Sequence, residues 1–157
     1  MLHRIDISDD GARFRLRTAT EEDLPNIAQL DREVFADAAY PFFVLRQLFD
    51  VGFAPIVVED SGQICAYALY SASEARGWVL TLAVVRPARG RGLGRLLMRE
   101  VLRCLRHRQV RQVLLTVEPT NTTAIDLYSS LGFTCGEAAH TDYFGPGEDR
   151  LIMTLPL

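Results

Sequence analysis

A glycine-rich segment between a strand and a helix constrains this chain more than any other feature. The segment reads Arg89-Gly90-Arg91-Gly92-Leu93-Gly94-Arg95. The apolar run Trp78–Val85 before it predicts a strand, and the apolar residues after it recur at helical spacing as far as Leu105. A second strand is predicted at Val113–Val117. Because two strands joined by one helix usually lie parallel in the same sheet, the sequence predicts a β-α-β crossover with the glycines at its turn.

Apolar periodicity predicts further strands and helices around this crossover. They are a strand at 13–18, a helix from a capped start at Thr20–Asp23 to Val34, a short helix from Pro41 to Leu48, a hairpin of 55–59 and 64–70, a helix at 124–131 ended by Gly132, and strands near 133–138 and 151–155. A length of 157 residues favours one domain, 1–157. We therefore expect a single α/β (α+β) domain with a mixed, mostly antiparallel sheet flanked by helices on both faces.

The composition excludes several classes of protein. A hydrophobic fraction of 48% and a charged fraction of 24% are typical of a globular chain and not of a disordered one. Three cysteines, an odd number without a CxxC pair, argue against a disulfide framework and a zinc site, so we expect no metal. No apolar run approaches the ~20 residues of a membrane span, and the first residues lack a signal peptide's apolar stretch. We expect a soluble, cytoplasmic protein.

The basic residues are concentrated beside the glycines. All 17 are arginines, and nine of them fall between Arg86 and Arg111. They form either a solvated helix face or a site for a phosphate-bearing ligand, which the planar guanidinium and a helix N-terminus both favour. The GxGxG spacing fits neither a P-loop nor a dinucleotide fingerprint. A formal net charge of −3 argues against nucleic-acid binding.

A second motif lies downstream, where Asn121 is followed by Tyr128-x-x-Leu-Gly-Phe133. Together the two motifs resemble the GNAT superfamily of acetyl-CoA-dependent N-acetyltransferases. Arg89-x-x-Gly92-x-Gly94 is similar to its pyrophosphate-binding motif, and the downstream motif is similar to its second cofactor segment. Residues 119–128 and 143–153 resemble the branch that acetylates protein N-termini, such as the alanine of a ribosomal protein.

The resemblance implies acetyl-CoA as the cosubstrate. The backbone of a strand edge would bind the pantetheine arm, the backbone amides of the glycine-rich segment would bind the pyrophosphate, and two residues of the downstream motif would complete the site. The residues so implied are Leu82, Ala83, Val84, Arg89, Gly90, Arg91, Gly92, Leu93, Gly94, Arg95, Asn121 and Tyr128. Two alternatives stay open, because an asparagine at a helix start is a common N-cap and Tyr128 has the helical spacing of a core residue.

The resemblance also implies catalytic roles. Tyr128 would donate a proton to the departing thiolate, because a phenol with a pKa near ~10 is a suitable acid. The related branch carries a glutamate as general base where this chain has Thr116, so Glu118, two residues on, is the candidate base. Other candidates for the base are Glu33, His140 and Tyr143. Direct attack in a ternary complex needs no enzyme nucleophile, so we expect the cysteines to be inert.

The resemblance implies that the acceptor is a primary amine, on either a peptide N-terminus or a small molecule. Aromatic residues around the second predicted helix form part of the core, a wall of the acceptor groove or the surface of a homodimer; they are Tyr40, Phe42, Phe43, Phe49 and Phe53. The alternative function is a non-catalytic acyl-CoA-binding sensor, which Thr116 favours and Tyr128 disfavours.

Overall fold

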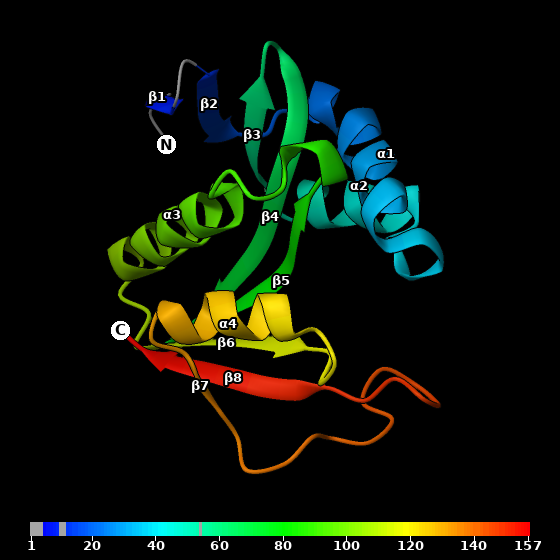
Figure 1. Ribbon diagram of the computed structural model, residues 1–157, viewed down its shortest axis with the longest axis vertical. Coiled ribbons are helices and arrows are strands. Elements are labelled where there is room, and N and C mark those ends of the chain that lie inside the picture. Colours follow the sequence, from blue (N-terminus) through cyan, green and yellow to red (C-terminus); the bar gives the residue numbers. More distant parts are fainter. Residues whose placement is uncertain (1–4, 10–11, 54) are drawn as a thin grey trace. The chain divides into compact units, whose positions relative to one another are not determined.

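The computed structural model describes residues 5–9, 12–53 and 55–157, with the elements labelled in Figure 1. Contacts between Cα atoms divide the chain into two units. Unit 1 comprises Met1–Tyr70 and Thr81–Val101, and unit 2 comprises Ser71–Leu80 and Leu102–Leu157. The hydrogen-bonded strand order is β1-β2-β3-β4-β5-β6-β8-β7.

Antiparallel strands form the sheet of unit 1. Their bounds are β1 Ile5–Asp9, β2 Ala12–Thr18, β3 Ile56–Asp60, β4 Gln63–Ser73 and β5 Arg76–Val84, of which β4 and β5 continue into unit 2. The register pairs Leu16 with Val58, and Val58 with Ala66. The predicted hairpin is confirmed, whereas β1 was not predicted, although Ile5 and Ile7 alternate with polar residues.

Two helices of unit 1 follow β2. The 3₁₀ helix η1 (Glu21–Asp23) leads into α1 (Leu24–Phe35), and η2 (Ala36–Ala38) leads to α2 (Phe42–Asp50). Apolar side chains of both helices join the strands in a core cluster; it consists of Ala19, Ile27, Ala28, Leu30, Leu45, Val57, Tyr67, Leu69 and Ala83.

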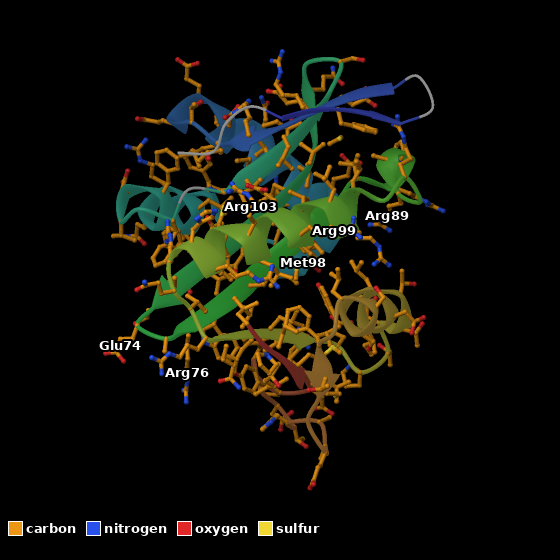
Figure 2. All side chains as sticks on the ribbon, turned by 90° about the vertical axis from the view of Figure 1, so that its left-hand side faces the viewer. Glu74, Arg76, Arg89, Met98, Arg99 and Arg103 are labelled. Carbon is orange, nitrogen blue, oxygen red and sulfur yellow. The ribbon has the colours of Figure 1, made fainter. Side chains whose placement is uncertain are left out.

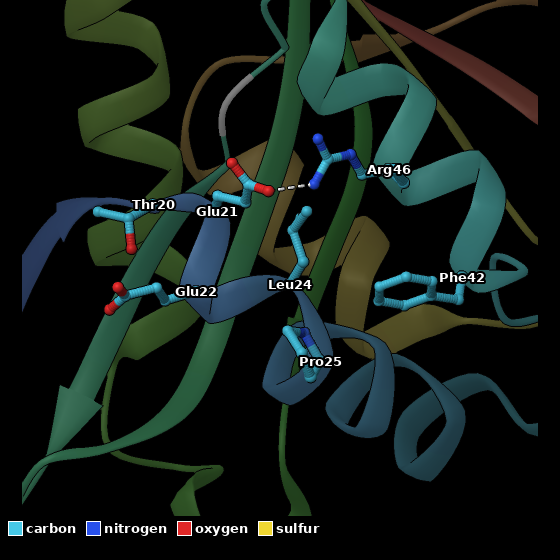
Figure 3. Close-up of a pocket in the computed structure, with 7 residues that line it drawn as sticks. All are labelled: Thr20, Glu21, Glu22, Leu24, Pro25, Phe42 and Arg46. Carbon is cyan, nitrogen blue, oxygen red and sulfur yellow. Dashed lines mark hydrogen bonds and ion pairs between the residues drawn. The ribbon is translucent and has the colours of Figure 1, made fainter.

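The aromatic residues around α2 are divided between core and surface. Tyr40 and Phe53 pack against the core cluster, but Phe42 and Phe43 are 47% and 63% exposed. Phe42 also lines a shallow pocket with Pro25 and Arg46, and the Arg46 guanidinium pairs with Glu21 across it (Figure 3). Of these aromatic residues, Tyr40 and Phe53 therefore belong to the core, whereas Phe42 and Phe43 at the start of α2 lie on the surface.

A parallel strand pair begins the sheet of unit 2. Residues Arg76–Val79 of β5 run parallel to β6 (Gln112–Val117), which confirms the predicted crossover through α3 (Leu93–His107). Strand β8 (Leu151–Pro156) is antiparallel to β6, and β7 (Thr134–Cys135) pairs with β8. Helix α4 covers Thr122–Ser130.

Strand β7 is shorter than the sequence predicts. The expected strand at 133–138 is wrong beyond Cys135, because Gly136 makes one more backbone bond, to the Ile152 carbonyl at 3.1 Å, and the chain then leaves the ladder. Within the described ranges, no helix is both long and apolar enough to cross a membrane.

An ion-pair network fixes the start of α1. The two terminal guanidinium nitrogens of Arg17, Nη1 and Nη2, donate to the Asp23 carboxylate at 2.6 and 2.8 Å, and its Nε donates to Glu59 at 2.9 Å. The Thr20 amide donates to Asp23 Oδ2 at 2.7 Å, so the predicted helix cap is confirmed. The hydrogen bonds from Arg17 hold the pKa of Asp23 below its usual value despite burial.

Replacing Asp23 with asparagine should lower the free energy of unfolding by about 1–3 kcal/mol at neutral pH, because Arg17 loses its charged acceptor. The folded-state pKa of Asp23 is lower than the unfolded value of 3.8, so its stabilisation is complete above that pH. It is lost as the pH falls through the folded-state pKa. Urea unfolding of parent and variant should therefore show a gap at neutral pH that closes on acidification. The exposed pair Arg46–Asp50 provides the control, since Asp50→Asn should change little. A gap independent of pH would contradict the role of Asp23.

Candidate active site

The turn from β5 into α3 depends on two glycines with left-handed backbone. Strand β5 ends at Val84, the 3₁₀ helix η3 (Arg86–Ala88) follows, and α3 begins at Leu93. Gly90 and Gly92 have φ angles of +78° and +75°, which glycine adopts without strain. No described atom lies within 4 Å of the place where a Cβ would stand at either position. The loop is therefore open to the close approach of a ligand to its backbone.

The same turn leaves backbone donors available. The first N–H groups of an α-helix have no partner inside the helix, and they carry the positive end of its dipole. Within the described part of the chain, the N–H groups of Gly90, Arg91 and Gly92 make no backbone hydrogen bond. These donors and the start of α3 lie where the sequence predicts an anion site, and phosphate binding there stays a prediction.

Two arginine side chains of the loop contact the protein. Arg89 Nε donates to the Val84 carbonyl at 3.0 Å, and Arg91 Nη1 donates to Asp60 Oδ2 at 2.9 Å. The Arg91 guanidinium also lies 4.3 Å from the centroid of the Phe14 ring. Arg99 and Arg103 have exposed side chains along α3, whereas Arg89 stands at the loop before it (Figure 2). The arginine cluster therefore contains both anchors and solvated residues.

The strand segment expected to bind pantetheine lies at the end of β5. Ala83 is buried in the core cluster of unit 1, and its neighbours Leu82 and Val84 are half-buried. The parallel ladder of β5 covers only Arg76–Val79 and so stops before Leu82. The Val84 carbonyl already accepts a hydrogen bond from Arg89.

In unit 2, Asn121 caps helix α4. Its side-chain Oδ1 accepts a hydrogen bond from the Ala124 backbone N–H at 3.1 Å, and the Asn121 backbone N–H donates to the Glu118 carbonyl at 3.0 Å. The N-cap interpretation of Asn121 is confirmed. Its contact with the cofactor stays a prediction, and the exposed position of Asn121 is compatible with it.

Tyr128 is buried on α4. It is 8% exposed, and its ring lies 6.0 Å from that of Phe133 in a tilted arrangement. Burial alone raises the pKa of Tyr128 to about 12. The phenol keeps its proton at neutral pH and packs as a core residue, but a raised pKa makes it a weaker acid, and its role as proton donor stays a prediction.

Glu118 is exposed and paired. Its side chain is 58% exposed, and Oε1 lies 3.7 Å from Arg150 Nη2, which also binds Glu148 at 2.8 Å. Thr116, half-buried on β6, faces Ile152 of β8 in register. The structure therefore places the Glu118 carboxyl group just after β6, exposed and beside the Arg150 guanidinium.

Other candidate bases lie in different surroundings. His140 forms an isolated bridge with Arg150, with its amide 2.7 Å from the Arg150 carbonyl, and its ring lies 5.8 Å from that of Tyr143. Glu33 belongs to unit 1 and is exposed on α1. Burial raises the pKa of Cys65 to about 11, which leaves an unreactive thiol. Among the residues that the structure describes, no cluster of potential metal ligands occurs.

Asp31 was missed from the sequence, although its spacing with Leu24, Ile27 and Ala28 places it on the buried face of α1. It is 0% exposed, and burial raises its pKa. Its carboxylate accepts hydrogen bonds from the Tyr67 hydroxyl and, at 2.6 Å, from the Tyr40 amide. Asp31 thereby fixes the chain just before α2 against strand β4.

Comparisons with known proteins agree with this geometry. The family model described as the acetyltransferase (GNAT) family matches residues 16–133. An N-alpha-acetyltransferase of Sulfolobus acidocaldarius is 25% identical over 169 residues, which cover 98% of this chain and 100% of that protein. A mycothiol acetyltransferase of Rhodococcus opacus is 47% identical over 68 residues, which cover 43% of this chain and 21% of that protein.

A solved structure supports the fold. The crystal structure of the ribosomal-protein-S18-alanine N-acetyltransferase from Escherichia coli matches with a TM-score of 0.81 and 24% identity, covering 91% of this chain and 93% of that one. The fold that the sequence predicts is therefore confirmed. Because the family model covers three quarters of the sequence, from residue 16 to residue 133, this chain belongs to the GNAT family of acetyl-CoA-dependent acetyltransferases and is an N-acetyltransferase.

Proposed function

We propose that this enzyme transfers the acetyl group of acetyl-CoA to the α-amino group of a protein or peptide N-terminus. The observation that carries this proposal is Thr116 at the position expected to hold a glutamate base, with the remaining carboxylate, Glu118, exposed and paired with Arg150. We therefore expect the site to provide only a weak general base for the proton of the attacking amine. It therefore suits an acceptor that is already partly deprotonated.

The pKa of the acceptor decides between amines. An α-amino group has a pKa of about 7.7–8.0, so roughly a tenth of it is neutral at pH 7. A lysine side chain, with a pKa of about 10.4, is neutral in about one molecule in two thousand. A weak base is therefore sufficient for an α-amine but not for lysine. The end-to-end match to an N-alpha-acetyltransferase supports the same acceptor class.

The glycine-rich loop fits the pyrophosphate of acetyl-CoA. Its left-handed glycines present an open backbone surface, and the start of α3 supplies N–H donors. The strand end at Leu82–Val84 would bind the pantetheine arm through its backbone, and Asn121 would contact the arm from the start of α4. Acetyl-CoA supplies the activated acetyl group.

Two side chains of unit 2 would carry out the proton transfers of the reaction. The Tyr128 phenol, which is protonated at neutral pH as any phenol is, would give its proton to the departing CoA sulfur. Glu118, or a water molecule bound to it, would accept the proton of the attacking amine. The amine attacks the thioester carbonyl directly, the C–S bond breaks, and no acyl-enzyme forms.

A small-molecule amine is the second candidate acceptor. It is favoured by the 47% identity over 68 residues to a mycothiol acetyltransferase, although that match covers only 21% of that protein. The two acceptor classes are separated by rate measurements.

Thiol release from acetyl-CoA should be fastest with a peptide that has a free N-terminus. The same peptide blocked at its N-terminus and carrying one lysine should react roughly a few hundredfold more slowly at neutral pH, because so little of its amine is neutral. The rate with the free peptide should rise with pH and level off above about pH 8. Glucosamine and spermidine test the alternative, and faster release with either would contradict the peptide assignment.

Coenzyme A should raise the melting temperature. At a hundred times its Kd it adds about 2.7 kcal/mol, or about 5–10 °C for a chain of this size. Gly92→Val should abolish this shift, because valine does not tolerate the left-handed backbone of the loop. Gly52→Val is the matched control, since Gly52 also has a positive φ and open surroundings but lies after α2. If Gly92→Val responds to CoA as the parent does, the loop is only a turn.

Tyr128→Phe should lower kcat by about 10²–10⁴, the usual effect of losing a general acid. The ring and its packing on Phe133 remain, so the melting temperature should hardly change. Measuring both quantities on one variant separates the proposed acid from a core residue. A fully active variant would assign the proton donor to water and contradict the role of Tyr128.

A further inference from the structure

We propose that the ion pair of Arg91 with Asp60 holds the glycine-rich loop in its phosphate-binding shape, so that the side chains of Arg91 and Asp60 position the loop and do not themselves bind the phosphate. This inference rests on the proposed binding of acetyl-CoA at the loop. It concerns two side chains that none of the catalytic roles above uses. All of the contacts that carry it lie within unit 1.

The position of Arg91 makes it suitable as an anchor. It stands between Gly90 and Gly92, the two residues with left-handed backbone, where the loop has least conformational restraint of its own. Its side chain leaves the loop and reaches the end of β3, where Nη1 donates to Asp60 Oδ2 at 2.9 Å. The two glycines, which have the greatest backbone freedom, therefore stand on either side of a residue whose side chain is bound to the sheet.

The Arg91 side chain ends on the paired strands β2 and β3. The Arg91 guanidinium lies 4.3 Å from the centroid of the Phe14 ring, and Phe14 is only 2% exposed. Phe14 of β2 and Asp60 of β3 are partners in the strand register. Arg91 therefore contacts two residues that pair with each other across β2 and β3, and these two contacts together restrict the conformation of its side chain.

The charge of Asp60 argues against a simple electrostatic role. A carboxylate beside an anion site repels a phosphate and neutralises the arginine that would attract it. The pair is also partly exposed, at 36% for Arg91 and 32% for Asp60, and such pairs contribute little to folding. Holding the loop in place explains why a carboxylate here is compatible with anion binding.

Removing the charge of Asp60 distinguishes phosphate binding by the Arg91 side chain from positioning of the loop, because the two roles predict opposite changes in the affinity for CoA. If Arg91 bound the phosphate directly, Asp60→Asn would free its guanidinium and remove a repelling charge, so CoA would bind more tightly. If the pair positions the loop, Asp60→Asn should weaken CoA binding. We expect a rise in Kd of about fivefold, the size that one partly exposed ion pair provides.

The measurement is calorimetric titration of CoA into the parent, Asp60→Asn and Asp50→Asn. The control removes the carboxylate of Arg46–Asp50, a pair with similar distance and exposure on α2. We expect weaker binding in Asp60→Asn alone, with melting temperatures of the unliganded proteins alike. Unchanged or tighter binding by Asp60→Asn would overturn the inference. A parent that does not bind CoA would contradict the proposed function instead.

Two further variants and a truncated substrate test the mechanism. In Arg91→Gln the Kd should rise as in Asp60→Asn, and the double variant should be no weaker than either, because both changes break the same tether. With S-acetylpantetheine, which has no pyrophosphate, the KM of Asp60→Asn should equal that of the parent, whereas with acetyl-CoA it should rise with kcat unchanged. Additive losses, or equal rises in KM with both substrates, would show a general disturbance of unit 1 and overturn the positioning role.

Discussion

The turn between β5 and α3 is the constraint on which the candidate site depends. The chain must leave a strand at Val84 and begin a helix at Leu93, with Gly90 and Gly92 in the left-handed region on the way. A residue with a Cβ would be strained at both glycines. Among the described residues, the same turn leaves N–H groups before α3 without backbone partners. One backbone feature therefore sets the direction of α3 and provides the proposed anion site.

The chemistry is divided between backbone and side chains. The proposed binding elements of unit 1 would act through main-chain groups, which is compatible with the contacts of the Arg89 and Arg91 side chains with Val84 and Asp60. The proposed proton-transfer residues of unit 2 would act through side chains whose surroundings differ: Tyr128 is buried, whereas Glu118 is exposed beside Arg150. A protonated acid and a weak base suit an acceptor amine of low pKa.

Much of the fold could be predicted from the sequence, because apolar periodicity marks each buried face. The parallel crossover, the hairpin, the capped start of α1 and the N-cap at Asn121 followed from such local patterns. Strand β7 was predicted too long because it lies at a sheet edge and its partner β8 is distant in the chain. Strand β1 was missed although it pairs with its neighbour β2 and its apolar residues alternate. The ion pairs of Arg91 and Glu118 join residues far apart in the chain, and no local pattern predicts them. Asp31 is different, since its place on the apolar face of α1 was visible in the sequence.

The most direct test of the proposed activity is to locate the acetyl group on a peptide that offers both a free α-amine and an internal lysine. After incubation with acetyl-CoA at neutral pH, tandem mass spectrometry assigns the modified nitrogen. We predict acetylation of the α-nitrogen, with the lysine unmodified. Acetylation of the lysine, or no transfer to either amine, would contradict the assignment of this enzyme to protein N-termini.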